Sequence, residues 1–425
     1  MKKLIYAIVV VFFATTIITP FAQAYTQTPV EIAQEYGYGV DERYQPEGLV
    51  SISHTGQVLY DYEGHQQWNP ASMTKLMTMY LTLKTVKEGK LSLTDTVKIT
   101  DEHYRMSTLP ELSNTKLYPG ETYTIAELLQ ITVSASSNAA SLILANEVSK
   151  NTSDFVDLMN STAKNLGMTD THYVNPTGAE NYLLQEYAPE RYQSETSTVT
   201  SAHDYAILAQ HVVADTPDIL AFTKQVAPTQ HAVTYYTFNH LLEGANMSVP
   251  GTDGLKTGSS DVADYNSTVT TKRGNFRIYS VILGAGDYVN LGGEKQRDMM
   301  SASTINAMFD QYEYRKILSK GYHKINGTQY YVTEDFYDVV PRDMKAPYQF
   351  VVDDGKVHID YQREFISKAY GPPTVKVERP FIHGSKSVVK SSWDAHPVLT
   401  TIGLFFLVMF FSIIIYYILL RFRKH

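Results

Sequence analysis

The 425-residue sequence contains no cysteine. It therefore cannot form a disulfide, a catalytic thiolate or a cysteine-ligated metal centre. The Gly-x-Ser-x-Gly turn that carries the nucleophile of α/β-hydrolases is also missing, and the 13 histidines are scattered along the chain. Because we find no histidines and carboxylates at metal-ligand spacing, we expect neither a metal ion nor a cofactor.

An excess of positive charge is missing as well. The formal net charge is -8, and it becomes more negative if Lys2 and Lys3 leave with a cleaved leader. Proteins that bind nucleic acid through phosphate contacts usually carry an excess of lysine and arginine. We therefore expect no nucleic-acid partner.

The two ends of the sequence predict secretion and membrane attachment. Residues 1–24 combine a basic start, an apolar run and the small-residue site Ala22-Gln23-Ala24, which is the pattern of a signal peptide. Residues 397–420 contain no charged residue and are followed by a basic tail at 421–425. A run of this length can cross a bilayer as a transmembrane helix, and the basic tail predicts its cytoplasmic end. We expect a single-pass protein of the cell membrane whose body lies on the extracytoplasmic side.

Hydrophobic periodicity predicts an α+β region at 25–316. Residues 50–62 alternate around a Thr-Gly turn, as in a β-hairpin, whereas 72–87 and most of 92–166 have a helical period. From residue 254 the period returns to two, which predicts an antiparallel sheet. Helices and strands in separate blocks favour an α+β fold over a βαβ alternation.

The sequence changes character again at 317–383. Short alternating runs are joined there by Asn-Gly and Asp-Gly, which are strong hairpin signals. We expect a small all-β domain, followed by a linker at 384–396.

Three short motifs give the chain its chemistry. Ser72 stands three residues before Lys75 at the start of a predicted helix, so the two side chains share a face. That spacing alone is not specific, because Ser387 precedes Lys390 in the same way in the linker. The chain adds Ser136-Ser137-Asn138 at a predicted helix break and Lys256-Thr257-Gly258 at the start of a predicted strand. The three motifs in this order match the serine–lysine set of penicillin-recognising enzymes.

On these motifs, and on "HYVNPTGAE" around residues 175–178, the chain resembles the low-molecular-mass penicillin-binding proteins. This is the serine-type D-alanyl-D-alanine carboxypeptidase family, and within it the chain looks most like the staphylococcal-type penicillin-binding protein 4. The resemblance implies a serine β-lactamase/transpeptidase-like catalytic domain at 25–316. It also implies peptidoglycan stem peptides ending in D-Ala-D-Ala as substrate, and β-lactam antibiotics as covalent inhibitors.

The resemblance assigns catalytic roles to four residues. A serine hydroxyl needs a base, and a lysine can be that base if burial and a second cation, here Lys256, lower its pKa. We therefore expect Lys75 to be neutral and to take the proton of Ser72. By the resemblance, Ser136 relays a proton to the leaving D-alanine and Asn138 donates to the substrate amide.

The same resemblance implies a substrate-binding strand. Lys256 and Thr257 hold the terminal carboxylate, and Gly258 lets the strand backbone approach the substrate. The backbone N–H groups of Ser72 and Ser259 form the oxyanion hole.

Three further positions are weaker candidates. Glu111, Phe238 and Tyr288 correspond to positions near the substrate groove of the staphylococcal type. For these residues a surface cap or a core aromatic is nearly as good an interpretation.

Three other functions remain open from the sequence. A D,D-transpeptidase shares every one of these residues and passes the acyl group to an amine instead of water, and the resemblance favours some cross-linking activity beside trimming. A class A β-lactamase uses an additional glutamate in a Glu-x-x-Leu-Asn run, which we do not find. A catalytically silent wall-binding protein is disfavoured by the intact motifs.

Overall fold

The computed structural model describes residues 26–289, 292–380, 389–390 and 392–422. The predicted signal peptide, part of the linker and the end of the basic tail lie outside these residues. The chain divides into two compact units. The first runs to Tyr314 and also includes Val339–Lys345 and Tyr361–Gly371, and the second holds the remaining segments from Arg315 onward.

The first unit is built on one antiparallel sheet. Its strand order is β2 (Val58–Tyr62), β1 (Gly48–Ser53), β9 (Phe276–Ala285), β8 (Asp264–Arg273) and β7 (Thr252–Ser260). The hairpin expected at 50–62 is present as β1 and β2. Strand β7 is at one edge, so one side of its backbone has no neighbouring strand in this sheet.

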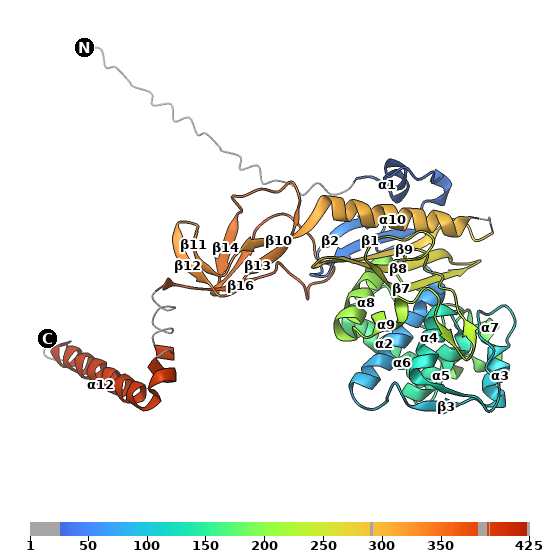
Figure 1. Ribbon diagram of the computed structural model, residues 1–425, viewed down its shortest axis with the longest axis horizontal. Coiled ribbons are helices and arrows are strands. Elements are labelled where there is room, and N and C mark those ends of the chain that lie inside the picture. Colours follow the sequence, from blue (N-terminus) through green and yellow to red (C-terminus); the bar gives the residue numbers. More distant parts are fainter. Residues whose placement is uncertain (1–25, 290–291, 381–388, 391, 423–425) are drawn as a thin grey trace, which may run out of the picture. The chain divides into compact units, whose positions relative to one another are not determined.

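Helices cover both faces of this sheet. On one face, α1 (Pro29–Glu35) and α10 (Gly293–Gln311) pack together and against the strands, and on the other face α8 (Ala202–Asp215) packs on β1 and β9 (Figure 1). Alternate residues of β9 divide between two hydrophobic clusters: Ile278 belongs to the α10 side and Val281 to the α8 side. The period-two pattern is therefore that of a strand buried on both faces.

A bundle of helices lies on the α8 side of the sheet. Helix α2 (Lys75–Lys87) is at its centre and contacts α4 (Ile125–Ser134), α5 (Asn138–Val148), α6 (Thr152–Leu166) and α8. Because every residue from Lys75 to Leu83 is buried, α2 is a core helix and not an amphipathic surface helix. The smaller elements of this unit are η1 (Glu42–Tyr44), η2 (Ala71–Thr74), β3 (Thr96–Lys98), α3 (Asp101–Ser107), β4 (Thr122–Thr124), α7 (Asn181–Leu184), η3 (Gln185–Tyr187), η4 (Glu190–Tyr192), α9 (Ile219–Thr223), β5 (Thr229–Gln230) and β6 (Val233–Thr234).

The second unit contains a small sheet, which confirms the predicted all-β domain. Its strand order is β11 (Gly321–Ile325), β12 (Thr328–Val332), β16 (Val375–Glu378), β15 (Lys356–Ile359) and β14 (Phe350–Asp353). The Asn-Gly and Asp-Gly pairs form the β11–β12 and β14–β15 turns with positive φ at both residues, as type I′ turns require. Strands β10 (Tyr312–Leu318) and β13 (Phe336–Pro341) form a separate pair.

The last described element is a long apolar helix. Helix α12 (Pro397–Phe422) includes the 24 residues Pro397–Leu420, with a mean hydropathy of 2.7 and no buried residue in that window. By length and composition it could cross a membrane. The predicted fold class is thus confirmed: an α+β catalytic unit, a small all-β domain and a C-terminal helix that could span a bilayer.

Asn266 connects the sheet to the loop that leads into Ser72. Its side chain is fully buried, donates to the carbonyl of Asn69 at 3.0 Å and accepts from the N–H of Gly284 at 2.7 Å. Because each buried group left unpaired costs about 1–3 kcal/mol, we expect Asn266→Ala to lower the free energy of unfolding by that amount for each lost bond. Urea denaturation followed by tryptophan fluorescence measures the change.

The matched control is Asn165→Ala, on the exposed side of α6. It should change the free energy of unfolding by less than about 0.5 kcal/mol. Equal stabilities of the two variants would contradict the role given to Asn266.

Candidate active site

Ser72 lies in a short helical turn with an unusual backbone. It belongs to η2, which runs directly into α2. The preceding Ala71 has a φ of 45°, in the left-handed region, and such a conformation costs a residue with a side chain about 1–3 kcal/mol. The side chain of Asn69 accepts a hydrogen bond from the Ala71 N–H at 2.8 Å, and the Met73 N–H donates to the Pro70 carbonyl at 3.1 Å. These two bonds hold the turn that presents the serine.

Lys75 points back at this serine from the first position of α2. Its Nζ lies 2.8 Å from Ser72 Oγ, 2.9 Å from Asn138 Oδ1 and 2.7 Å from the carbonyl oxygen of Thr177. A neutral amine has two N–H groups and one lone pair. It can therefore donate to the Asn138 and Thr177 oxygens while its lone pair accepts the Ser72 proton.

The surroundings of Lys75 favour that neutral form. The side chain is fully buried, and its hydrogen-bond partners in the described part of the chain include no carboxylate. Burial lowers the pKa of the ammonium well below its usual 10.5, and the charge of Lys256 lowers it further. The lysine therefore loses its proton more readily than an exposed lysine does, and as a neutral amine it can accept one.

Ser136 and Asn138 lie where α4 ends and α5 begins. Ser136 has a φ of 53°, and its Oγ is buried without a hydrogen-bond partner among the described residues. An unpaired buried hydroxyl is unfavourable, and it is therefore a candidate for a functional group. Asn138 donates one amide N–H to the carbonyl of Ser113 at 2.9 Å. This bond orients the side-chain oxygen of Asn138 toward Lys75.

The Lys-Thr-Gly motif lies on the edge strand β7. Lys256 and Thr257 are buried, and Ser259 is exposed. The Nζ of Lys256 donates to the Thr257 carbonyl at 2.9 Å. Burial, and then the nearby charge of Arg297, lower the pKa of Lys256 to about 7. Its charge is therefore easily restored by an anion such as a carboxylate.

Two glycines contact the backbone of the serine turn from opposite segments. A Cβ on Gly258 would lie 2.5 Å from the Pro70 carbonyl oxygen and 3.0 Å from the Ser72 nitrogen. A Cβ on Gly178 would lie within 2.6 Å of the Ala71 carbonyl group, and Gly178 also has a φ of 77°. Only glycine fits either position, because the obstructing atoms are backbone.

The structure adds the segment 175–178 to the predicted site. The Thr177 carbonyl is a direct partner of Lys75, while Asn175 accepts from the N–H groups of Thr177 and Gly178 and so fixes this turn. In the sequence, this segment contributed only to the family resemblance. Its Asn-Pro-Thr-Gly run predicts a turn. The sequence cannot show that a backbone carbonyl of this turn accepts a hydrogen bond from Lys75, because every residue has such a carbonyl.

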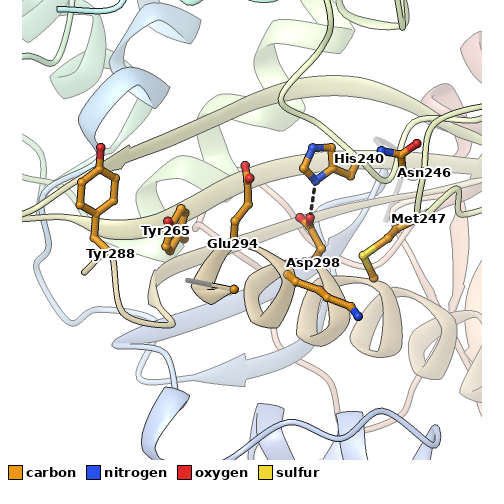
Figure 2. A pocket seen from close by; sticks show the side chains of 9 residues that line it. His240, Asn246, Met247, Tyr265, Tyr288, Glu294 and Asp298 are labelled. Carbon is orange, nitrogen blue, oxygen red and sulfur yellow. Dashed lines mark hydrogen bonds and ion pairs between the residues drawn. The ribbon is translucent and has the colours of Figure 1, made fainter. Parts of the chain in front are cut away.

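The three weaker candidates are not brought together. Phe238 is partly exposed and lines a hollow of about 450 Å³ with Ala135, next to Ser136. Tyr288 lines a different hollow, of about 530 Å³, where its ring centroid lies 5.6 Å from that of Tyr265 (Figure 2). Glu111 is exposed in the loop after α3 and lines neither hollow. Their roles stay predictions.

Both units match known protein-family models. Residues 49–287 match the family described as D-alanyl-D-alanine carboxypeptidase, and residues 314–378 match a domain of unknown function, DUF1958. The chain is 31% identical to D-alanyl-D-alanine carboxypeptidase DacF of Bacillus subtilis over 293 residues, 68% of each protein. It is 31% identical to DacC of Escherichia coli over 234 residues, 54% of each, so it spans about half the length of that relative.

Solved structures show the same fold. A peptidoglycan synthesis regulatory factor (PBP3) of Streptococcus pneumoniae superposes with a TM-score of 0.69 at 25% identity, covering 79% of this chain and 98% of that one. Penicillin-binding protein D2 of Listeria monocytogenes, bound to ampicillin, has a TM-score of 0.50 at 24% identity, covering 62% and 97%.

Gly258 generates a steric prediction. In Gly258→Ala the new methyl group must displace the backbone that carries the Ser72 N–H, so we expect the rate of acylation by a fluorescent penicillin to fall by about 10²-fold. The control is Gly39→Ala, where a Cβ meets no atom within 4 Å, and which should acylate at the unchanged rate. Equal rates for both variants would contradict the close approach.

The two lysines generate a pH prediction. With Lys75 in its predicted role as base, acylation needs the neutral amine, so its second-order rate constant should fall on acidification as Lys75 becomes protonated. With Lys256 in its predicted role of holding the carboxylate of penicillin, acylation also needs this lysine charged, so the rate constant should fall again above about pH 7, the pKa of Lys256. Stopped-flow acylation from pH 5 to 10 should give a bell-shaped profile, and Lys256→Arg should remove its alkaline limb. A flat profile would exclude this ionisation scheme.

Proposed function

Because this chain belongs to the D-alanyl-D-alanine carboxypeptidase family, we propose that it removes the terminal D-alanine of peptidoglycan stem peptides through an acyl-enzyme on Ser72. The resemblance to the low-molecular-mass penicillin-binding proteins is thereby confirmed, whereas the finer likeness to the staphylococcal type is not. The observation that carries the proposal is the buried Lys75 with its Nζ 2.8 Å from Ser72 Oγ.

The first half of the reaction forms the ester. Ser72 Oγ attacks the carbonyl carbon of the penultimate D-alanine while Lys75 Nζ takes the hydroxyl proton. Collapse of the tetrahedral intermediate breaks the C–N bond, and the leaving amine of D-alanine takes up a proton. The unpaired hydroxyl of Ser136 is the group we assign to carry that proton from Lys75.

The substrate is held along β7. An extended peptide can pair with the free edge of this strand, which places its backbone beside Gly258. The N–H groups of Ser72 and Ser259 are the oxyanion donors in this proposal. Lys256 and Thr257 bind the terminal carboxylate, whose negative charge favours the charged form of Lys256.

The second half of the reaction releases the ester. Water gives the trimmed peptide, and an amine from a neighbouring strand would give a cross-link. Transpeptidation stays a prediction, because the two reactions share the groups described above. A β-lactam presents a carboxylate and a reactive amide to the same groups, so we propose that it acylates Ser72 and leaves slowly.

The membrane attachment also belongs to the proposal. Helix α12 is long and apolar enough to span a bilayer. With the basic residues that follow it on the cytoplasmic side, the catalytic unit would lie outside the membrane. There it would meet the peptidoglycan that it trims.

Replacing Ser72 tests the proposal. Ser72→Ala should show no penicillin adduct in peptide mass spectrometry, and its release of D-alanine from muropeptides should fall by at least about 10³-fold. Separating the muropeptide products also reports whether the wild-type chain trims, cross-links or does both. Rapid turnover of penicillin by the wild-type chain would favour a β-lactamase.

The matched control is Ser387→Ala, which removes the serine of the second Ser-x-x-Lys sequence. It should label with penicillin and release D-alanine like the wild-type chain. A wild-type chain without an adduct on the Ser72 peptide would favour a silent wall-binding protein.

A further inference from the structure

Three residues from distant segments meet on the surface of the first unit. His65 lies in the loop between β2 and η2, Asp170 follows α6, and His203 is in the first turn of α8. One potential ligand atom from each lies within 4.8 Å of the other two. We propose that these three side chains bind one divalent metal ion of the zinc class.

The donor set is the first argument. Two imidazoles and one carboxylate suit zinc, and three protein ligands with water in the fourth position form a common zinc arrangement. The described residues contain no other group of three such side chains this close together. Their exposure decreases from His65, at 63% of its side chain, through Asp170, at 23%, to His203, at 16%. The open side could therefore hold a water ligand.

The present spacing is the second argument. His65 Nδ1 lies 2.7 Å from Asp170 Oδ2, and the rings of His65 and His203 stack with centroids 4.1 Å apart. Ligand atoms that share one zinc ion at about 2.0–2.2 Å lie roughly 3–3.5 Å from one another. Because the lone pair of an imidazole nitrogen lies in the ring plane, the exposed His65 ring must turn out of its stack on His203 for both rings to point at one ion. The hydrogen bond between His65 and Asp170 would then be replaced by one bond from each residue to the metal.

The residues around the cluster already fix two of the ligands. Asp204 accepts from the backbone N–H of Asp170 at 2.7 Å, and its other oxygen lies 3.4 Å from His203 Nδ1. Ser201 Oγ donates to Asp170 Oδ2 at 3.0 Å. A carboxylate behind a ligating histidine, as Asp204 is here, fixes the ring and leaves its other nitrogen for the metal.

The position of the cluster suggests what the metal does. The loop 63–70, which we call the approach loop, runs from His65 into the serine turn. Its backbone is bonded to the segment that leads into α8: His203 N–H donates to the Gly64 carbonyl at 2.8 Å and Trp68 N–H donates to the Thr200 carbonyl at 2.7 Å. The side-chain amide of Gln67 donates to the Asp170 carbonyl at 3.0 Å. A metal ion would join the approach loop, the segment at Asp170 and α8 at one point. Its role is structural, and the proposal does not depend on the proposed reaction.

Metal titration of the full chain in detergent, after chelator treatment, tests the inference. With ZnCl2 alone, we expect calorimetry to show one site, and with CoCl2 an absorption band of a low-coordinate cobalt ion. His65→Ala and Asp170→Asn should each weaken zinc binding by at least about tenfold. Zinc should also raise the melting temperature of the wild-type chain and not that of either variant.

The chain supplies a matched control in His172. This histidine also pairs with a carboxylate, Glu195, at 2.6 Å, and it has no third ligand within the described residues. His172→Ala should bind zinc and cobalt like the wild-type chain. Equal binding by His65→Ala and His172→Ala, or no binding by the wild-type chain, would overturn the proposal. Penicillin labelling of each variant without added metal would show that the catalytic unit is folded.

Discussion

The burial of one amine is the constraint on which the rest of the active site depends. A lysine inside a protein is costly as an ammonium ion, and it becomes stable as a neutral amine if its two N–H groups find acceptors. Lys75 meets this requirement with oxygens from Asn138 and Thr177, and its third neighbour is the hydroxyl of Ser72. The two bonds that stabilise the neutral lysine in the core also leave its lone pair for the Ser72 hydroxyl, and so prepare the activation of the serine.

This constraint explains why the site is assembled from four separate segments. Helix α2 supplies Lys75 from its first turn, the break between α4 and α5 supplies Asn138, the turn at 175–178 supplies a carbonyl, and β7 supplies a second cation. These segments can surround one amine only if they approach the serine turn very closely. Gly178 and Gly258 permit that approach, because each lies where a Cβ would overlap backbone atoms of the turn. The close packing of these segments is therefore a condition for the reactivity of the site.

The sequence predicted much of this arrangement. The change of hydrophobic period separated the helices from the strands, and the Asn-Gly and Asp-Gly pairs located turns of the second unit. The serine–lysine motifs named residues that the fold does bring together around Ser72. The weaker candidates are placed differently, since Phe238 and Tyr288 line two separate hollows. The sequence could not show this, because loop residues carry no periodic signal that fixes their position. The expectation of no metal site rested on local spacing, whereas His65 and Asp170 stand 105 positions apart and meet only in the fold.

By itself the sequence determined which reactive groups the protein has, since the identity and local spacing of its serines, lysines and glycines are set by the covalent chain. It also determined the apolar helix at the C-terminal end, whose length and composition are local properties. The tertiary structure decided how readily those groups lose a proton. The pKa of Lys75 falls because distant segments exclude water and bring Lys256 close, and exclusion of water is a property of the packed fold. Likewise, Thr177 became a ligand of Lys75 through its backbone carbonyl, a group that every residue has and that only geometry can select.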